Sequence, residues 1–126
     1  MSDQQILLPG AVAAADLSAE QYAGVYLTDD RTVAKITDSN AAAFAQAGIG
    51  ILQNDPNAAG KAAEVVMLGI CRAECGGTVA QGAYLVLNND GEVIAGALEA
   101  DKASADRAVI GRALSDGADG DIIDVA

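Results

Sequence analysis

Three carboxylates within six residues form the segment best equipped to bind a hard cation. They are Asp116, Asp119 and Asp121, and Gly117 and Gly120 lie between them. The segment lacks the ligand spacing and the closing glutamate of a calcium-binding EF-hand loop. Asp and Gly are also the residues typical of tight turns. The sequence therefore favours a turn with solvated charges and leaves a cation site as the alternative.

Cys71 and Cys75 are the next candidates for metal binding or nucleophilic chemistry. In a strand their α-carbons would lie about 13 Å apart, too far for a disulfide. The chain has no histidine, so the usual zinc ligand sets and the Ser-His-Asp and Cys-His catalytic sites cannot form. No glycine-rich stretch matches a phosphate-binding loop. We expect buried, reduced thiols, no enzymatic activity, no cofactor and no bound metal.

The charge of the chain excludes other classes of partner. It carries 18 acidic and 7 basic residues, for a net charge of −11. Such a domain repels phosphate, so we expect no direct contact with nucleic acid.

No apolar stretch approaches the roughly 20 residues that span a bilayer, and the N-terminus lacks the features of a signal peptide. We therefore expect no membrane association.

The hydrophobic content suggests a thin core and self-association. A length of 126 residues fits one domain. Hydrophobic residues make up 52% of the chain, but alanine is their largest group. Alanine contributes far less burial energy than the about 1.5 to 3 kcal/mol of a larger apolar side chain. A chain of this kind gains much from docking on a partner, so oligomerisation is expected.

Short β-branched runs separated by turn residues predict a mainly β (α+β) fold, a small compact β-barrel-like domain with one or two short helices. The Asp90-Gly91 pair within Asn88–Gly91 is the strongest hairpin signal. The predicted hairpins pair residues 25–27 with 33–36 and residues 84–87 with 92–95; further strands are predicted at 49–52, 63–71, 109–114 and 122–125. A short helix is predicted at 41–47, and a single helical turn at 17–21, with Ser18 as cap. Residues 100–108 are consistent with either a helical turn or a polar loop.

The two parts of the chain resemble each other at an offset of about 60 residues. The matches are Leu27 with Leu87, Asp30 with Asp90, Val33 with Val93, Ile49-Gly50 with Ile110-Gly111, and Gly60 with Gly120. Two readings stay open at this point: a duplicated β unit, or a coincidence of common β patterns in a simple alphabet. The first predicts two similar β halves packed into one body.

The order of glycines and apolar runs also resembles a known family. The relevant segments are Ile49–Pro56, Gly60, Val65–Gly69, Gly76–Gly77, Gly82, Asn89–Gly91, Ile110–Leu114 and Gly120–Ile123. The sequence resembles the small head-decoration (cement) proteins of tailed double-stranded-DNA bacteriophages, whose compact β-tulip-like fold is similar to that of the lambda-type head-decoration protein. The resemblance spans residues 22–126 and is clearest over 47–126. The cysteines and the acidic residues Asp119–Asp124 depart from it.

This resemblance implies a structural role without covalent chemistry. The protein would be made in the host cytoplasm, bind the outer surface of the expanded head as a homotrimer, contact the major capsid protein and hold the shell against internal DNA pressure. Residues 1–20 would form a flexible capsid-binding arm and residues 21–126 a single β-rich decoration domain. The expected contact residues are Ile6, Leu7, Leu8 and Pro9.

A free-standing recognition module for carbohydrate or a host surface is the alternative. Such β domains use exposed aromatic side chains to stack on sugars. The chain has three tyrosines and no tryptophan, which weighs against this reading.

Overall fold

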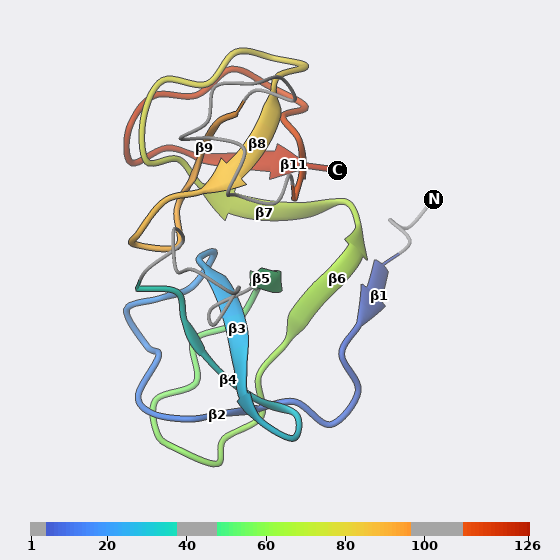
Figure 1. The fold of residues 1–126 in the computed structure, drawn as a ribbon, viewed down its shortest axis with the longest axis vertical. Coiled ribbons are helices and arrows are strands. Elements are labelled where there is room, and N and C mark those ends of the chain that lie inside the picture. The colour runs from blue at the N-terminus through green and yellow to red at the C-terminus, as the bar shows by residue number, and fades with distance from the viewer. Residues whose placement is uncertain (1–4, 38–47, 97–109) are drawn as a thin grey trace.

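The computed structural model describes residues 5–37, 48–96 and 110–126, and in these ranges the chain is built of strands and turns without a helix (Figure 1). The strands are β1 (Gln5–Leu7), β2 (Val12–Ala13), β3 (Gly24–Asp29), β4 (Thr32–Lys35), β5 (Gly48–Leu52), β6 (Val65–Gly69), β7 (Cys71–Glu74), β8 (Tyr84–Leu87), β9 (Val93–Ala95), β10 (Gly111–Arg112) and β11 (Ile122–Val125). They form a six-stranded sheet in the order β1-β6-β5-β3-β4-β2, a three-stranded sheet β10-β8-β9 and the pair β11-β7. The prediction of a mainly β fold is confirmed.

Both predicted hairpins are present, because their turns are specified locally. β3 pairs with β4 across a turn in which Arg31 takes a φ of 53°, and β8 pairs with β9. In the second turn the Asn88 side-chain oxygen accepts the backbone N–H groups of Asp90 and Glu92, both at 2.9 Å. Gly91 takes a φ of 76° there, which glycine adopts without strain.

Two expectations for the local structure are corrected. The strand predicted over residues 63–71 breaks into β6 and β7, because Gly69 takes a φ of 107° and turns the chain. Residues 17–21 form turns instead of a helix, since the Leu17 N–H donates to the Pro56 carbonyl and fixes the chain to a distant loop. Ser18 caps nothing and donates its own N–H to Asp16. The predictions for residues 41–47 and 100–108 lie outside the described residues.

The six-stranded sheet curls until its ends approach each other. Beyond β4, strand β2 pairs in parallel, and Val12 also forms a bridge to Ala62, just before β6. The Ala13 N–H donates to the Lys61 carbonyl and the Ala63 N–H to the Ala11 carbonyl, both at 2.9 Å. Residues 11–13 therefore close one side of a half-barrel and shield its interior.

The backbone pairing repeats along the chain. We call residues 5–69 the first half and residues 71–126 the second half. The order β5-β3-β4 in the first half recurs as β10-β8-β9 in the second. Registers recur as well: Val25 faces Lys35 and Gly50, and Leu85, 60 positions later, faces Ala95 and Gly111.

The buried side chains repeat with the same offset of 60 to 62 residues. One hydrophobic cluster, in the first half, contains Ala11, Ala13, Leu17, Val25, Val33, Leu52, Ala63 and Val65. The equivalent positions are all members of the other cluster: Ala73, Cys75, Val79, Leu85, Val93, Ala113, Ile123 and Val125. This agreement in register and burial supports two similar β halves over coincidence.

The two halves pack through the β8–β9 hairpin, whose loop lies between them in Figure 1. The Gly24 N–H donates to the Gly91 carbonyl at 2.7 Å. Leu87 fills the space beside Gly24 and Gly48, where a side chain would collide with it. Ile36, from the first half, belongs to the same buried cluster as Leu87. The second half is thus seated on one end of the first.

Candidate interaction surface

The N-terminal segment places apolar side chains on the outside of the sheet. Strand β1 pairs with β6, so that Ile6 faces Leu68, and the Leu8 N–H donates to the Val65 carbonyl at 3.0 Å. Between Ile6 and Leu7 the pairing skips Met67 of β6, and both the Ile6 and the Leu7 side chains are exposed. Pro9 is exposed too, whereas Leu8 is half-buried against the core of the first half. The structure thus exposes three of the four predicted contact residues, and their role in binding stays a prediction.

Strand β6 extends this surface with two residues that the sequence did not single out. Met67 is 47% and Leu68 65% exposed, although Val65 and Val66 just before them are buried. We call Ile6, Leu7, Met67 and Leu68 the β1–β6 surface. Consecutive side chains of a strand point to opposite faces of the sheet, so a run of four apolar residues places apolar side chains on both faces. The run at residues 65–68 was therefore the signal that could have revealed these exposed side chains. The surface carries no charge on a chain whose net charge is −11.

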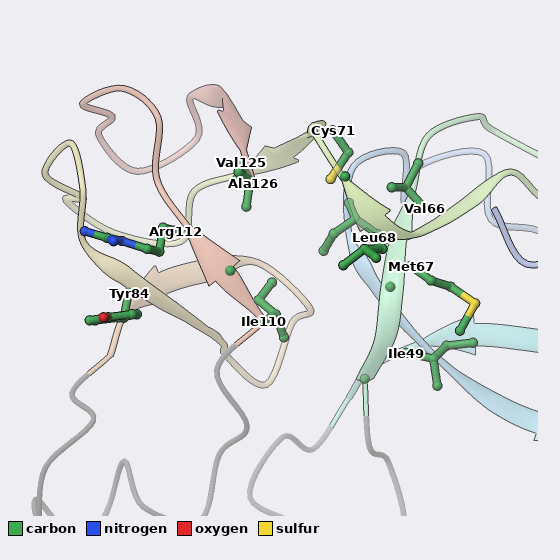
Figure 2. Close-up of a pocket in the computed structure, with 15 residues that line it drawn as sticks. Ile49, Val66, Met67, Leu68, Cys71, Tyr84, Ile110, Arg112, Val125 and Ala126 are labelled. Atoms are coloured by element: carbon green, nitrogen blue, oxygen red, sulfur yellow. The ribbon is translucent and has the colours of Figure 1, made fainter. Parts of the chain in front are cut away.

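Next to this surface a groove of about 500 Å³ separates the two halves (Figure 2). Ile49, Met67 and Leu68 lie on one side of it, and Tyr84, Ile110 and Arg112 on the other. The walls are equivalent parts of the halves, β5 with β6 and β10 with the chain end at Ala126.

Two equivalent glycines shape the walls of the groove. A Cβ at Gly50 would collide with the Val66 carbonyl oxygen, and one at Gly111 would lie 2.5 Å from the Ala126 carbonyl oxygen. Among the described residues of the lining, Arg112 is the one with a charged side chain. Its guanidinium lies 4.9 Å from the Tyr84 ring centroid and donates to the Gly82 carbonyl at 3.1 and 3.2 Å. The groove can therefore accept apolar side chains, with a cation at one edge.

The carboxylates predicted as a turn or a cation site take part in backbone hydrogen bonds. Asp116 accepts the Gln81 N–H at 2.7 Å, and Asp121 accepts the Ala118 N–H at 2.9 Å. Gly120 takes a φ of 88° in this turn. Among the residues that the structure describes, no group of three or more acidic, cysteine or histidine side chains is placed to hold a metal ion. The geometry is that of a turn.

A second acidic group lies beside the contact between the halves. Glu20, Glu74, Asp90, Glu92 and Lys35 line a shallow depression there. The hydrogen bond between Glu74 and Glu92 raises the pKa of Glu74, and burial and the charges of neighbouring carboxylates raise it further. Lys35 binds Glu20 at 3.3 Å. The carboxylates around this depression repel one another, and protonation of Glu74 weakens that repulsion.

The cysteines are buried, free thiols, as predicted. Burial, and then the charge of Asp124, raises the pKa of Cys71 to about 11, so the thiol stays neutral. Neutral thiols are poor nucleophiles and poor metal ligands. Cys75 occupies the core position equivalent to Ala13, where small size is the requirement. Packing explains both residues.

The comparison with solved structures shows a likeness in fold. No protein-family model matches the sequence, and no curated protein is significantly similar to it. No described helix is long and apolar enough to cross a membrane. The fold is similar to the crystal structure of the head fiber gp8.5 N base in bacteriophage phi29, with a TM-score of 0.59 and 16% sequence identity. The similarity covers 98% of this chain and 92% of that chain, so the whole two-half arrangement has a counterpart in the base of a phage head fiber.

Proposed function

We propose that the chain is a structural protein of a bacteriophage head, bound to the outer surface of the capsid. The observation that carries the proposal is the likeness of its fold, over nearly the whole of both chains, to a protein of the phi29 head. The sequence resemblance to head-decoration proteins points to the same part of a virion. It acts by binding, without covalent chemistry, and its finer role is that of a decoration protein that strengthens the expanded head.

The proposed capsid contact is the β1–β6 surface. Its four apolar side chains come from two paired strands, carry no charge and are exposed in the isolated chain. Covering apolar surface contributes roughly 25 cal/mol per Å². Because the chain as a whole carries a net charge of −11, an uncharged surface lets an acidic shell protein approach with less charge repulsion. The major capsid protein is the proposed partner, and a homotrimer the proposed assembly.

Co-sedimentation with heads tests this proposal. Heads assembled without the protein, in expanded and unexpanded forms, are mixed with the purified chain, and bound copies are counted. We expect binding to expanded heads, and a loss of at least about tenfold in affinity for the double variant Ile6→Ser with Leu68→Ser. Both side chains are more than half exposed, so the variant should fold. Leu114→Ser, which removes another exposed leucine, is the matched control.

Each result has a defined meaning. If neither form of the head binds the chain while a glycan screen finds a ligand, the phage-head role fails and the recognition module is favoured. If heads bind the double variant as well as the unmodified chain, the contact lies elsewhere on the molecule.

A second role within the head is favoured by the compared structure, which is the base of a fiber. A decoration protein that binds only the expanded shell must raise its thermal stability by mass action. A fiber base has only to bind the head and need not raise the thermal stability of the shell. Thermal unfolding of heads with and without the bound chain separates the two roles: a raised transition supports decoration, and an unchanged transition at full occupancy supports a fiber base.

A further inference from the structure

The same antiparallel ladder occurs in both halves, but it continues further in the first half. In the second half it pairs β11 with β7 and is described as far as Val125, opposite Cys71. In the first half residues 61–63 pair with 11–13 at the equivalent positions, and the ladder then continues through β6 and β1 to Gly69, opposite Gln5. The end of β6 therefore has an equivalent place in the second half, and in the described part of the chain no strand fills that place.

The empty place coincides with the groove between the halves. By the offset of the repeat, Ala126 is the equivalent of Val66, because each of them borders the equivalent glycine of the neighbouring strand. A strand that continued the direction of β11 past Ala126 would stand where Met67 and Leu68 stand in the first half. In Figure 2 Ala126 lies at the upper end of the groove, and Ile110 and Leu68 lie on its two sides. The groove is thus the space for one further strand.

One wall of the groove is a strand edge that can accept a neighbour. β6 pairs with β5 at Val65 and Val66, and beyond Val66 the strands that the structure describes pair it with β1 alone. Successive residues of an antiparallel strand direct their backbone N–H and C=O groups to alternate edges, so a strand with one neighbour offers hydrogen-bonding groups to a second. Binding of an extended peptide to such an edge is β-augmentation.

The lining and the repeat together specify the chemistry of the occupant. The equivalent residues Ile49 and Ile110 lie on opposite sides of the groove, and its volume of about 500 Å³ falls within the range of about 300 to 1,000 Å³ that ligand sites have. Apolar side chains therefore fit between the walls. In the first half the equivalent place is taken by Met67, Leu68 and Gly69, which are two apolar residues followed by glycine.

We propose that the groove binds an extended segment of the major capsid protein, in which two apolar residues precede a small one. This segment pairs with the end of β6 and continues the ladder of β11. The strand form and the apolar character follow from the repeat and the lining, whereas the identity of the donor rests on the proposed function. Met67 and Leu68 belong both to the β1–β6 surface and to the groove, so a shell segment bound there extends the same contact.

Peptide binding tests the groove without heads. The probe is the peptide Val-Met-Leu-Gly-Ile, the sequence of residues 66–70, blocked at its C-terminus and labelled with a fluorophore. We expect saturable binding in fluorescence anisotropy, and at least about tenfold weaker binding of a peptide with Ser in place of Met and Leu. Ile110→Asp should weaken binding of the probe by a similar factor. Ile122→Asp makes the same change at an exposed isoleucine outside the lining and should leave binding unchanged.

A covalent form of the probe removes the dependence on peptide affinity and on the folding of Ile110→Asp. Met-Leu-Gly-Ile added directly after Ala126 is held beside the groove at high effective concentration. Because an occupant that binds only the folded state stabilises it, this extension should raise the thermal midpoint above that of a chain extended by Ser-Ser-Gly-Ile. Absence of peptide binding together with equal midpoints overturns the proposal, whatever the heads bind.

Competition on expanded heads tests the donor. Saturating probe peptide should lower the affinity of the chain for heads by at least about tenfold, and the Ser-substituted peptide should not. If the probe occupies the groove and heads bind the chain equally well, the capsid protein is not the donor: this inference fails and the proposed function stands. If heads bind no chain even without peptide, the proposed function fails, and the assignment of the donor fails with it.

Discussion

Single glycines decide how closely the strands of this protein can approach. Gly50 and Gly111 occupy equivalent positions, and a methyl group at either would press on a backbone carbonyl oxygen that cannot move alone. Gly50→Ala and Gly111→Ala should each lower the free energy of unfolding by about 1 to 3 kcal/mol, as overpacking does. Urea unfolding monitored by circular dichroism measures the change.

Gly77→Ala is the matched control for these two variants, because nothing lies within 4 Å of its added methyl group. It should be neutral or slightly stabilising, since alanine restricts the unfolded chain. Equal stability of Gly50→Ala and Gly77→Ala would show that β5 and β6 can separate without cost.

The Glu74–Glu92 pair should make stability depend on pH. The hydrogen bond to Glu92, burial and neighbouring charges raise the pKa of Glu74 in the folded state. Its stabilisation is therefore complete below the unfolded pKa and is lost as the pH rises through the raised value. Glu74→Gln keeps a hydrogen-bond donor without the charge, so it should raise the thermal midpoint at pH 7 and change little at pH 4. The gain should stay under about 1 kcal/mol, because solvent screens the pair.

Glu64→Gln removes the same charge at an exposed position outside this group and controls for net charge. If both variants gain equally at pH 7, the effect belongs to the overall charge of the chain and not to the pair.

At the scale of strands and turns, the two hairpin loops show how equivalent elements diverge. Arg31 and Gly91 both have positive φ, but Gly91 also lies under Gly24, where a Cβ would be 2.9 Å from the Gly24 carbonyl oxygen. Gly91→Ala should therefore cost about 1 to 3 kcal/mol from strain and overpacking together. Arg31→Gly should be neutral or stabilising by up to about 1 kcal/mol, since it relieves a positive φ. Chemical denaturation of both variants tests this difference, and a similar loss for the two would contradict it.

Some elements could be predicted because hydrogen bonds within a few residues specify them. Others depend on pairing between distant segments and could not be predicted from the sequence. The Asn88–Gly91 turn was predictable because its hydrogen bonds close within five residues. The pairing of β1 with β6 joins segments that are far apart in the sequence, and no local pattern encodes it. Exposure of Met67 and Leu68 follows from the divergence of β6 from β5 after Val66, where β6 pairs with β1 alone. The candidate surface was therefore found in part, through Ile6 and Leu7.

At the scale of the whole molecule, the repeat was visible in the sequence only as a few identities. Most equivalent core positions differ in residue type, as Ala13 and Cys75 or Leu17 and Val79 do, because a core requires apolar character and fitting volume more than identity. Backbone hydrogen bonds show the similarity of the two halves more clearly than residue identities do. The Tyr22 N–H donates to the Leu52 carbonyl at 2.7 Å, and the equivalent Gly82 N–H donates to Ala113 at 2.8 Å.

The seating of one half on the other should make the protein unfold as one unit. Leu87 is buried in a cluster that also contains Ile36, Ile51 and Val66 from the first half. Leu87→Ala leaves a cavity between the halves and should cost about 2 to 5 kcal/mol. Leu114→Ala removes the same atoms from the surface and should change stability by less than about 0.5 kcal/mol. The unmodified chain in dilute solution should give one transition, with coincident curves from circular dichroism and tyrosine fluorescence. Two separated transitions in the unmodified chain would show that the halves fold independently and that Leu87 does not couple them.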